Sequence, residues 1–297
     1  MRRVFITGGT GFFGKSMLDL RSRSDALRED EWTILSRDPD AFRARNPQFA
    51  ALPGVGFVRG DVRDFSAAGR FDCIIHAATA AVTTLSDEEM SSTILEGTRH
   101  VIDFAHRCGA GRILFTSSGA VYGPQTAPVA ETAECRPTTA YGRGKLEAER
   151  MLAESGLDVQ IARCFAFTGR FLSRDIHYAI GNFIGDCLSE RDIVIRGDGT
   201  PRRSYLYADD LVEWLFAVLE RGKPARPYNV GSARSVSIRE LAEVVRGALG
   251  GARRVRVLSE AKSGPASVYV PDVTRACAEL GTRETVSLED AIRLSAG

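Results

Sequence analysis

Tyr141 and Lys145 are the residues of this chain whose types and spacing most directly suggest catalysis. They stand four positions apart at the start of a stretch with helical character. Side chains four apart lie on one face of a helix, so the ammonium can approach the phenol. A cation at about 5 Å, at an effective dielectric constant near 20, favours the phenolate by about 3 kcal/mol. The pair is therefore typical of a base that accepts a proton from an alcohol. An isolated pair would more simply be a tyrosine at a helix start beside a surface lysine.

A serine stands where it could assist such a tyrosine. Ser117 and Ser118 follow an expected strand at residues 112–115, upstream of Tyr141. A hydroxyl at that point can donate to the reacting oxygen and hold it in line with the phenol. The alternative for both serines is an ordinary turn or capping role.

The first fourteen residues, MRRVFITGGTGFFG, predict a phosphate site. Gly8, Gly11 and Gly14 follow a short apolar run and precede a helical segment at residues 15–20. Glycines between a strand and a helix allow a tight turn and a close approach to a pyrophosphate, which the helix N-terminus then holds. One glycine triplet is weak evidence by itself, but this context predicts a dinucleotide site.

Composition excludes several classes of function. The chain has 297 residues, with 39 basic and 38 acidic side chains and a net charge of +1, so nothing favours nucleic acid or a membrane surface as partner. The six cysteines are scattered, with neither a C-x-x-C pair nor a histidine cluster, which predicts free thiols and no metal site. No apolar run is long enough for a signal peptide or a membrane span. We expect a cytoplasmic protein.

Short apolar runs alternate with helical segments and predict an α/β fold with a doubly wound parallel sheet. The expected strands after the first are residues 32–35, 55–58, 71–75, 112–115 and 159–163, and the long helices are 87–107 and 141–152. Ligands of such sheets bind beyond the carboxyl ends of the strands, where the unusual clusters fall. We expect residues 1–163 to form the dinucleotide-binding domain, with 204–222 returning to it. Residues 164–203 and 223–297 should form a smaller α/β cap, with 169–199 rich in loops.

With these features in place the chain resembles the extended short-chain dehydrogenase/reductases, within the NAD(P)-dependent nucleotide-sugar epimerase/dehydratase branch. The resemblance runs from the glycine turn almost to the end of the chain. It is carried by the segments GDV at 60–62, HAA at 76–78, SSGAVYG at 117–123, YGRGK at 141–145 and GDG…RSY…DD between 197 and 210. It implies a Rossmann fold, a sugar-nucleotide substrate and a homodimer built on the two long helices.

The resemblance also assigns roles to individual residues. Ser118, Tyr141 and Lys145 would be the catalytic set, with Ser118 preferred because it stands four residues before Tyr122. The residues expected to bind the cofactor are Gly8, Gly11, Phe12, Phe13, Gly14, Arg37, Asp61, Val62, Ala77, Ala78, Tyr141 and Lys145. For the sugar nucleotide the resemblance implies Arg203, whose guanidinium suits a diphosphate, and Asn182. His177 falls in the cap loop and is a further candidate for the substrate, against a packed or solvent-facing histidine.

Departures from the family pattern narrow the reaction. Family 4,6-dehydratases have an Asp-Glu pair after the catalytic threonine, where this chain has Gly119 and Ala120. Ala120 also replaces the cysteine of 3,5-epimerase/reductases, and Ala166 replaces an asparagine near the substrate. What remains is hydride transfer at one sugar carbon, most simply at C4. We favour an epimerase by family analogy. The alternatives are an NADPH-dependent 4-keto-6-deoxysugar 4-reductase and a non-catalytic dinucleotide sensor, although sensors typically lose the tyrosine or the lysine.

The choice between NAD and NADP depends on the end of the second strand. NAD enzymes of this family usually have an aspartate there that binds the ribose hydroxyls. This chain has Ser36 and Arg37, and an arginine can pair with the 2′-phosphate of NADP. Asp38 next to them could still serve the ribose, so the sequence favours NADP slightly. NADP in turn favours the reductase.

Overall fold

The computed structural model describes residues 1–79, 85–174, 178–250, 254–260 and 264–297, and the chain divides into two units. The first unit contains residues 1–123, 135–163 and 215–228. The second contains residues 124–134, 164–214 and 229–297. Each is described by itself.

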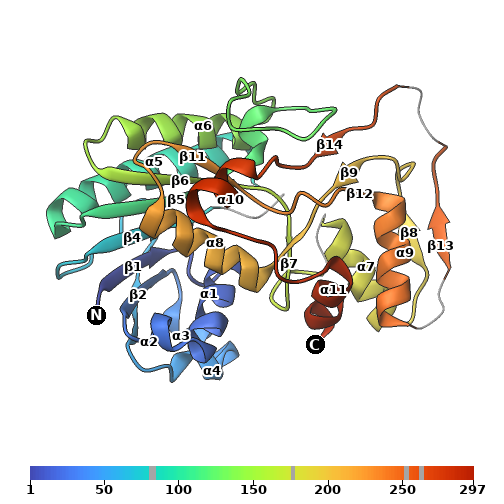
Figure 1. Ribbon diagram of the computed structural model, residues 1–297. Coiled ribbons are helices and arrows are strands. Elements are labelled where there is room, and N and C mark those ends of the chain that lie inside the picture. Colours follow the sequence, from blue (N-terminus) through green and yellow to red (C-terminus); the bar gives the residue numbers. More distant parts are fainter. Residues whose placement is uncertain (80–84, 175–177, 251–253, 261–263) are drawn as a thin grey trace. The chain divides into compact units, whose positions relative to one another are not determined.

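A seven-stranded sheet organises the first unit (Figure 1). Its order is β11-β6-β5-β4-β1-β2-β3, and the pairings of β1 with β2 and β4, β2 with β3, and β4 with β5 are parallel. The strands are β1 (Arg3–Thr7), β2 (Glu31–Ser36), β3 (Val55–Arg59), β4 (Cys73–His76), β5 (Arg112–Ser118), β6 (Asp158–Cys164) and β11 (Pro227–Val230). Successive strands run outward from β1 to β3, and β4 then lies on the other side of β1. In doubly wound sheets, the carboxyl ends of the two strands at such a reversal, here β1 and β4, are where ligands bind.

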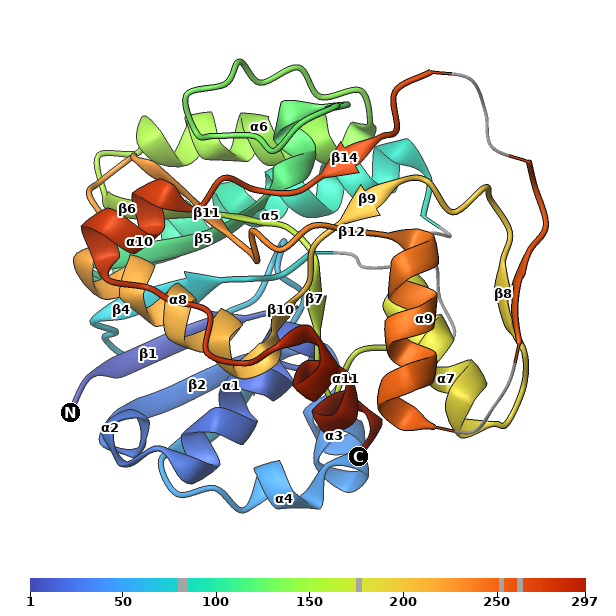
Figure 2. The same ribbon diagram turned by 45° about the vertical axis from the view of Figure 1, so that its right-hand side comes forward.

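Helices cover both faces of this sheet, which confirms the predicted doubly wound fold (Figure 2). The helices of this part of the chain are α1 (Phe12–Arg23), α2 (Asp25–Arg28), α3 (Pro39–Arg45), α4 (Pro47–Ala50), α5 (Asp87–Cys108), the 3₁₀ turn η1 (Gly119–Tyr122), α6 (Ala140–Ala153) and α8 (Ala208–Arg221). Phe5 and Phe115 pack with α5 and α6 in one core. On the other face Trp32 stacks on Phe216 of α8, with ring centroids 5.9 Å apart. Because helices cover both faces, the side chains on either side of each central strand are buried. This explains the continuous apolar runs in the sequence.

The second unit has short strands and three helices packed on one another. Its elements are β7 (Phe167–Thr168), α7 (Ala179–Leu188), β8 (Ile193–Ile195), β9 (Arg202–Arg203), β10 (Leu206–Tyr207), β12 (Val236–Ser237), α9 (Ile238–Leu249), β13 (Val255–Val257), β14 (Val268–Tyr269), α10 (Thr274–Leu280) and α11 (Leu288–Ala296). Ile184 of α7, Leu241 of α9 and Ile292 of α11 share one core. The strand β9 lies between β12 and β14, antiparallel to the first and parallel to the second.

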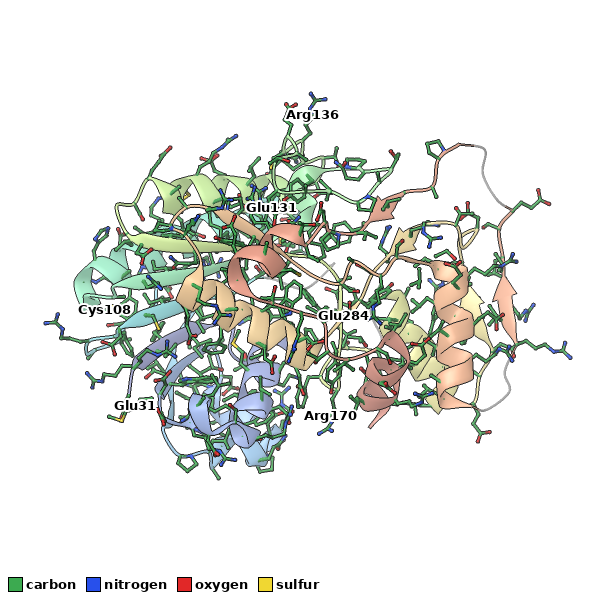
Figure 3. All side chains as sticks on the ribbon, viewed as in Figure 1. Glu31, Cys108, Glu131, Arg136, Arg170 and Glu284 are labelled. Atoms are coloured by element: carbon green, nitrogen blue, oxygen red, sulfur yellow. The ribbon has the colours of Figure 1, made fainter. Side chains whose placement is uncertain are left out.

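Buried carboxylates tie the segments of the second unit together. Glu131 accepts a hydrogen bond from the Asn229 amide at 2.8 Å and lies 3.7 Å from Arg275 (Figure 3). Glu284, also labelled there, accepts one from the Ser232 hydroxyl at 2.9 Å. These contacts join stretches far apart in the sequence and give a framework to a unit that has little sheet.

The expected strands and long helices agree with the structure to within a few residues, but the stretch 169–199 is not simply a loop. It contains α7, whose buried Ile180, Phe183, Ile184 and Cys187 recur at helical spacing. Two glycines inside the helix made that pattern hard to recognise. Within the described residues, no helix combines the length and apolar character needed to cross a bilayer.

Candidate functional site

The glycine turn between β1 and α1 has the shape of a phosphate cradle. Gly8 has φ +74°, and a Cβ there would lie 2.4 Å from the carbonyl oxygen of Ala77. A Cβ on Gly14 would lie 2.1 Å from the carbonyl of Gly9. Gly11 is the N-cap of α1; among the residues that the structure describes, no side chain caps it, and its first turn holds no acidic residue. The amides of this turn and the positive dipole end of α1 suit an anion, so these residues fit a dinucleotide.

A buried histidine fixes the neighbouring end of β4 beside this turn. His76 lies between two hydroxyls, with Nδ1 at 2.9 Å from Thr7 Oγ1 and Nε2 at 3.1 Å from Thr98 Oγ1. The amide of Ala78 donates to the same Thr7 oxygen at 3.1 Å. Burial, with a smaller contribution from the charge of Lys145, lowers the pKa of His76 to about 3. His76 is therefore neutral, and its bonds position Ala77 and Ala78 against the glycine turn.

The end of β2 differs from the arrangement that an NAD-binding aspartate would give. Ser36 is buried, and Arg37 is exposed. The carboxylate of Asp38 caps α3 by accepting from the Ala41 amide at 3.2 Å, and Arg59 lies 3.5 Å from it. Across the described ranges, no carboxylate lies within ion-pair distance of the Arg37 guanidinium. The one acidic side chain next to it is thus already used by the fold.

Asp61 and Val62 occupy the turn after β3. The Asp61 carboxylate accepts from the Arg63 amide at 3.1 Å and from its Nε at 2.7 Å, and the hydrogen bond from the Arg63 side chain is the main reason why the pKa of Asp61 is lowered. Val62 is buried, and a Cβ on Gly97 of α5 would lie 2.9 Å from its Cγ1. This turn is therefore rigid and carries a fixed negative charge.

The candidate catalytic residues meet at the carboxyl end of β5. Thr139 caps α6, so Tyr141 and Lys145 fall in its first two turns. Lys145 is 1% exposed, its Nζ donates to the Thr116 carbonyl at 2.8 Å, and it lies 5.9 Å from the centre of the Tyr141 ring. The Ser118 Oγ accepts from the Ala120 amide at 3.1 Å at the start of η1. The Lys145 ammonium thus lies near the Tyr141 ring on one helix face, and it binds the strand, β5, that ends at Ser118.

Ser117 and Ser118 point in different directions, as neighbours on a strand must. The Ser117 hydroxyl donates to the buried carboxylate of Glu149, which Arg163 holds through a second, bidentate contact. That hydroxyl is therefore part of the framework behind the site. Glu149 and Arg163 are functional candidates that were not predicted from sequence, although Glu149 continues the spacing of four that joins Tyr141 to Lys145.

The backbone leaves no room for larger side chains beside η1. Gly119 is buried and Ala120 is half-buried. A Cβ on Gly142 of α6 would lie 2.7 Å from the Ala120 carbonyl oxygen. The two positions at which the dehydratase pattern has acids therefore lie where α6 packs closely, and they offer no acid–base group.

In the second unit, two of the predicted substrate residues have unused hydrogen-bonding capacity. Arg203 of β9 donates through Nη1 to the Arg202 carbonyl at 2.8 Å and lies 5.8 Å from the Tyr269 ring centre. Its Nε and Nη2 have no partner among the residues the structure describes. The Asn182 Oδ1 on α7 is shielded from solvent and has no hydrogen-bond partner in that same part of the chain. His177 lies outside the described residues.

Arg202, the neighbour of Arg203, is already engaged. Its Nε donates to Ser235 Oγ and its Nη2 to the Ser235 carbonyl, each at 2.9 Å, and Glu240 lies 3.4 Å from it. The two adjacent arginines thus differ in kind. Arg202 holds β9 to the segment before β12, whereas two nitrogens of the Arg203 guanidinium have no partner among the described residues.

Comparison with known proteins extends over nearly the whole chain. The family model described as "NAD dependent epimerase/dehydratase family" matches residues 4–231. UDP-glucuronic acid decarboxylase 5 of Arabidopsis thaliana is 28% identical over 98% of this chain and 87% of its own length. DesIV, the dTDP-glucose 4,6-dehydratase of Streptomyces venezuelae solved with NAD and TYD bound, is 26% identical, covers 99% of this chain and 95% of its own, and has a TM-score of 0.85.

A third similarity concerns the fold alone. The UDP-N-acetylglucosamine 4-epimerase of Methanobrevibacter ruminantium M1 has a TM-score of 0.87 at 20% identity, over 99% of this chain and 97% of that one. The glycine cradle at α1, the Tyr141–Lys145 spacing and the extent of the family match lead to the same assignment. The chain belongs to the NAD-dependent epimerase/dehydratase family.

Proposed function

We propose that this protein is a nucleoside-diphosphate-sugar epimerase that works by hydride transfer at C4 of the sugar. The observation that carries the proposal is the buried Lys145 beside Tyr141, at the strand end where Ser118 also lies. The names of the relatives supply the substrate class, since all those cited above act on UDP- or dTDP-linked sugars. An epimerase needs no acid at Gly119 or Ala120, because no water leaves the sugar.

In this mechanism Tyr141 is the acid–base group. Its phenol accepts the proton of the C4 hydroxyl and later returns it, while the ammonium of Lys145 stabilises the phenolate. Ser118 donates to the same sugar oxygen and fixes its position. When bound, the nicotinamide supplies the hydride acceptor and donor. Glycines 8, 11 and 14, with the amides of α1, would hold its pyrophosphate, and Asp61, Val62, Ala77, Ala78, Phe12 and Phe13 would line the rest of the dinucleotide site.

The second unit would bind the nucleotide diphosphate. Among the described residues, Arg203 has donors left over and no carboxylate in ion-pair contact with it, which suits phosphate oxygens that accept two parallel bonds. The shielded Oδ1 of Asn182 would be satisfied by a donor on the ligand, because an unmade buried hydrogen bond is costly. His177 remains a candidate for the same role.

One observation favours a second candidate, an NADPH-dependent 4-ketoreductase. Asp38 is held by α3 and Arg59, which leaves Arg37 as the group at the end of β2 that can meet the adenosine ribose. We propose that Arg37 pairs with the 2′-phosphate of NADP. A reductase would release oxidised cofactor after each turnover, whereas an epimerase would retain it unchanged.

We also propose that the protein is a cytoplasmic homodimer. We expect the contact on α5 and α6, as the family resemblance implies; an open hollow of about 480 Å³ there is lined by residues such as Leu95, Arg143 and Leu146. Sedimentation analysis tests this, with two chains per particle as the expected result.

The decisive experiment is incubation with UDP-, dTDP-, GDP- and CDP-sugars and their 4-keto-6-deoxy forms, with NAD or NADP. Inversion at C4 without net change in reduced cofactor supports the epimerase. Stoichiometric oxidation of NADPH by a keto sugar supports the reductase and overturns the epimerase. Release of carbon dioxide from UDP-glucuronic acid would instead make the chain a decarboxylase, like its Arabidopsis relatives. If no sugar nucleotide reacts or protects against heating beyond the dinucleotide alone, the proposal fails.

A further inference from the structure

A buried ion pair lies directly behind the candidate catalytic residues. Arg163 of β6 donates to Glu149 of α6 through Nε at 3.0 Å and Nη2 at 2.7 Å, and the two side chains are 8% and 6% exposed. The Ser117 hydroxyl donates to the same carboxylate. The proposed reaction uses none of these groups. Burying a charge pair is expensive, and its net contribution to stability is often small. A role other than stability is therefore worth seeking.

The position of Glu149 on α6 gives it a second possible partner. It follows Lys145 by four residues and Tyr141 by eight, so all three project from one face of the helix. An anion and a cation at this spacing have Cβ atoms about 5 to 6 Å apart and attract each other. Both are buried, where such attraction is strong. A carboxylate free to turn toward Lys145 would neutralise the charge that should act on the phenol.

Arg163 prevents this by geometry. Its planar guanidinium takes both carboxylate oxygens at once and lies over the Tyr122 ring, with its central carbon 4.8 Å from the ring centre. A bidentate contact fixes the direction of the carboxylate as well as its distance. The ammonium of Lys145 donates instead to the Thr116 carbonyl. Its Nζ lies 4.7 Å from the centre of the Phe115 ring.

Other described groups packed around Lys145, Glu149 and Arg163 carry no formal charge. From β4, His76 is neutral because burial lowers its pKa to about 3. Cys135, which lines the outer side of the pair, is kept as a thiol because burial raises its pKa. Where α5 packs here, it presents the uncharged Ile94 and Thr98. Among these described side chains the formal charges are positive at Lys145 and Arg163 and negative at Glu149, so their sum is one positive charge.

We propose that Arg163 is a positioning residue of the reaction, which holds the Glu149 carboxylate on the β6 side so that Lys145 remains the charge acting on Tyr141. The proposal rests on the proposed function for its meaning in catalysis. Its electrostatic content concerns the folded protein alone and can be measured without a substrate.

The test is a set of variants followed by the pH dependence of kcat. In Arg163→Met the carboxylate is released toward Lys145. The acidic limb of the profile, where kcat rises with pH as the phenol ionises, should then move up by about one pH unit, with the KM of the sugar nucleotide unchanged. Arg163→Met/Glu149→Gln removes both charges and should restore the original profile. Arg163→Lys keeps a cation and should shift it less. Arg150→Met is the matched control, because Arg150 pairs with Glu147 on the exposed side of α6.

A second readout is the phenolate absorbance of Tyr141, taken as the difference between each protein and its Tyr141→Phe counterpart during a pH titration. Ionisation in Arg163→Met should follow the same upward shift. An unshifted Arg163→Met, or a double variant as shifted as the single one, overturns the proposal. If Arg163→Met does not fold, Glu149→Gln decides, since a rise in the ionisation pH there would contradict the account. If the unmodified enzyme shows no turnover, the proposed function fails. The Tyr141 titration then still decides whether Arg163 keeps the Glu149 charge away from Lys145.

Discussion

The two units hold their candidate functional side chains in opposite ways. In the first, Lys145 is 1% exposed and hydrogen-bonded to the sheet, and a buried ion pair supports the same helix face. In the second, Arg203 and Asn182 retain donors and an acceptor that no described residue satisfies. Groups that must act identically in every turnover are fixed before any ligand arrives, since catalysis depends on preorganisation. In the proposed function, Arg203 and Asn182 must meet a ligand, and their unused hydrogen-bonding atoms would serve that role.

This contrast predicts that changes in the first unit act on kcat and that changes in the second act on KM. The largest effect is expected for Tyr141→Phe, which keeps the ring but removes the proton-transferring hydroxyl. We expect kcat to fall by about 10³-fold, as loss of a general acid–base group does. Dinucleotide affinity, measured by calorimetry, should stay within about twofold because the fold is untouched. Substantial turnover by this variant would remove Tyr141 from the mechanism.

Arg203→Ala should act mainly on substrate affinity. Removal of a charge-assisted contact worth about 1.5 to 3 kcal/mol raises KM by roughly 10- to 100-fold. Steady-state kinetics with a saturating series of the sugar nucleotide measures this. Arg202→Ala is the matched control, since its guanidinium is used within the unit, and it should lower stability more than affinity. Equal KM values for the two variants would contradict the proposal that Arg203 binds the substrate and Arg202 does not.

Gly14→Ala tests whether the cradle is as tightly built as its geometry indicates. A methyl 2.1 Å from the Gly9 carbonyl forces the turn apart, and we expect a loss of about 1 to 3 kcal/mol in the free energy of unfolding, with weaker dinucleotide binding. Gly247 lies on the exposed face of α9 and has nothing within 4 Å of a new methyl, so Gly247→Ala should instead gain up to about 1 kcal/mol. Chemical denaturation of both proteins makes the comparison, and a neutral Gly14→Ala would show a looser turn.

The last prediction concerns the acid stability of the first unit. The pKa of His76 is about 3 in the folded chain and about 6.5 when unfolded, so the unfolded chain binds the extra proton first. The contribution is therefore complete above pH 6.5 and is lost as the pH falls toward 3, by at most about 1.4 kcal/mol per pH unit. Denaturation between pH 7 and 5 should show a flatter dependence in His76→Asn. An unchanged slope would mean that other groups govern the acid limb.

The sequence was sufficient to predict the sheet and the local motifs of the first unit, because strands buried on both faces and the glycine turn leave short-range signals. Tyr141 and Lys145 could be paired for the same reason, since four residues of helix fix their neighbourhood. The Glu149–Arg163 contact could not be found that way, because it depends on which strand packs against α6. In the second unit, α7 escaped prediction because its glycines weaken the helical pattern. Sequence could not show which of the two adjacent arginines, Arg202 or Arg203, has unused donors. That depends on the hydrogen bonds of Arg202 to Ser235 in the folded unit.

The central claim is that Lys145 lowers the pKa of the Tyr141 phenol, so that its phenolate form can accept a proton from the substrate. It is tested most directly by a near-ultraviolet pH titration of the protein minus its Tyr141→Phe variant, repeated in a Lys145→Met background. The account predicts ionisation of Tyr141 well below the usual tyrosine pKa of about 10, and a return toward that value when the ammonium is removed. Ionisation at the ordinary pH in the unmodified protein, unmoved by Lys145→Met, would contradict it.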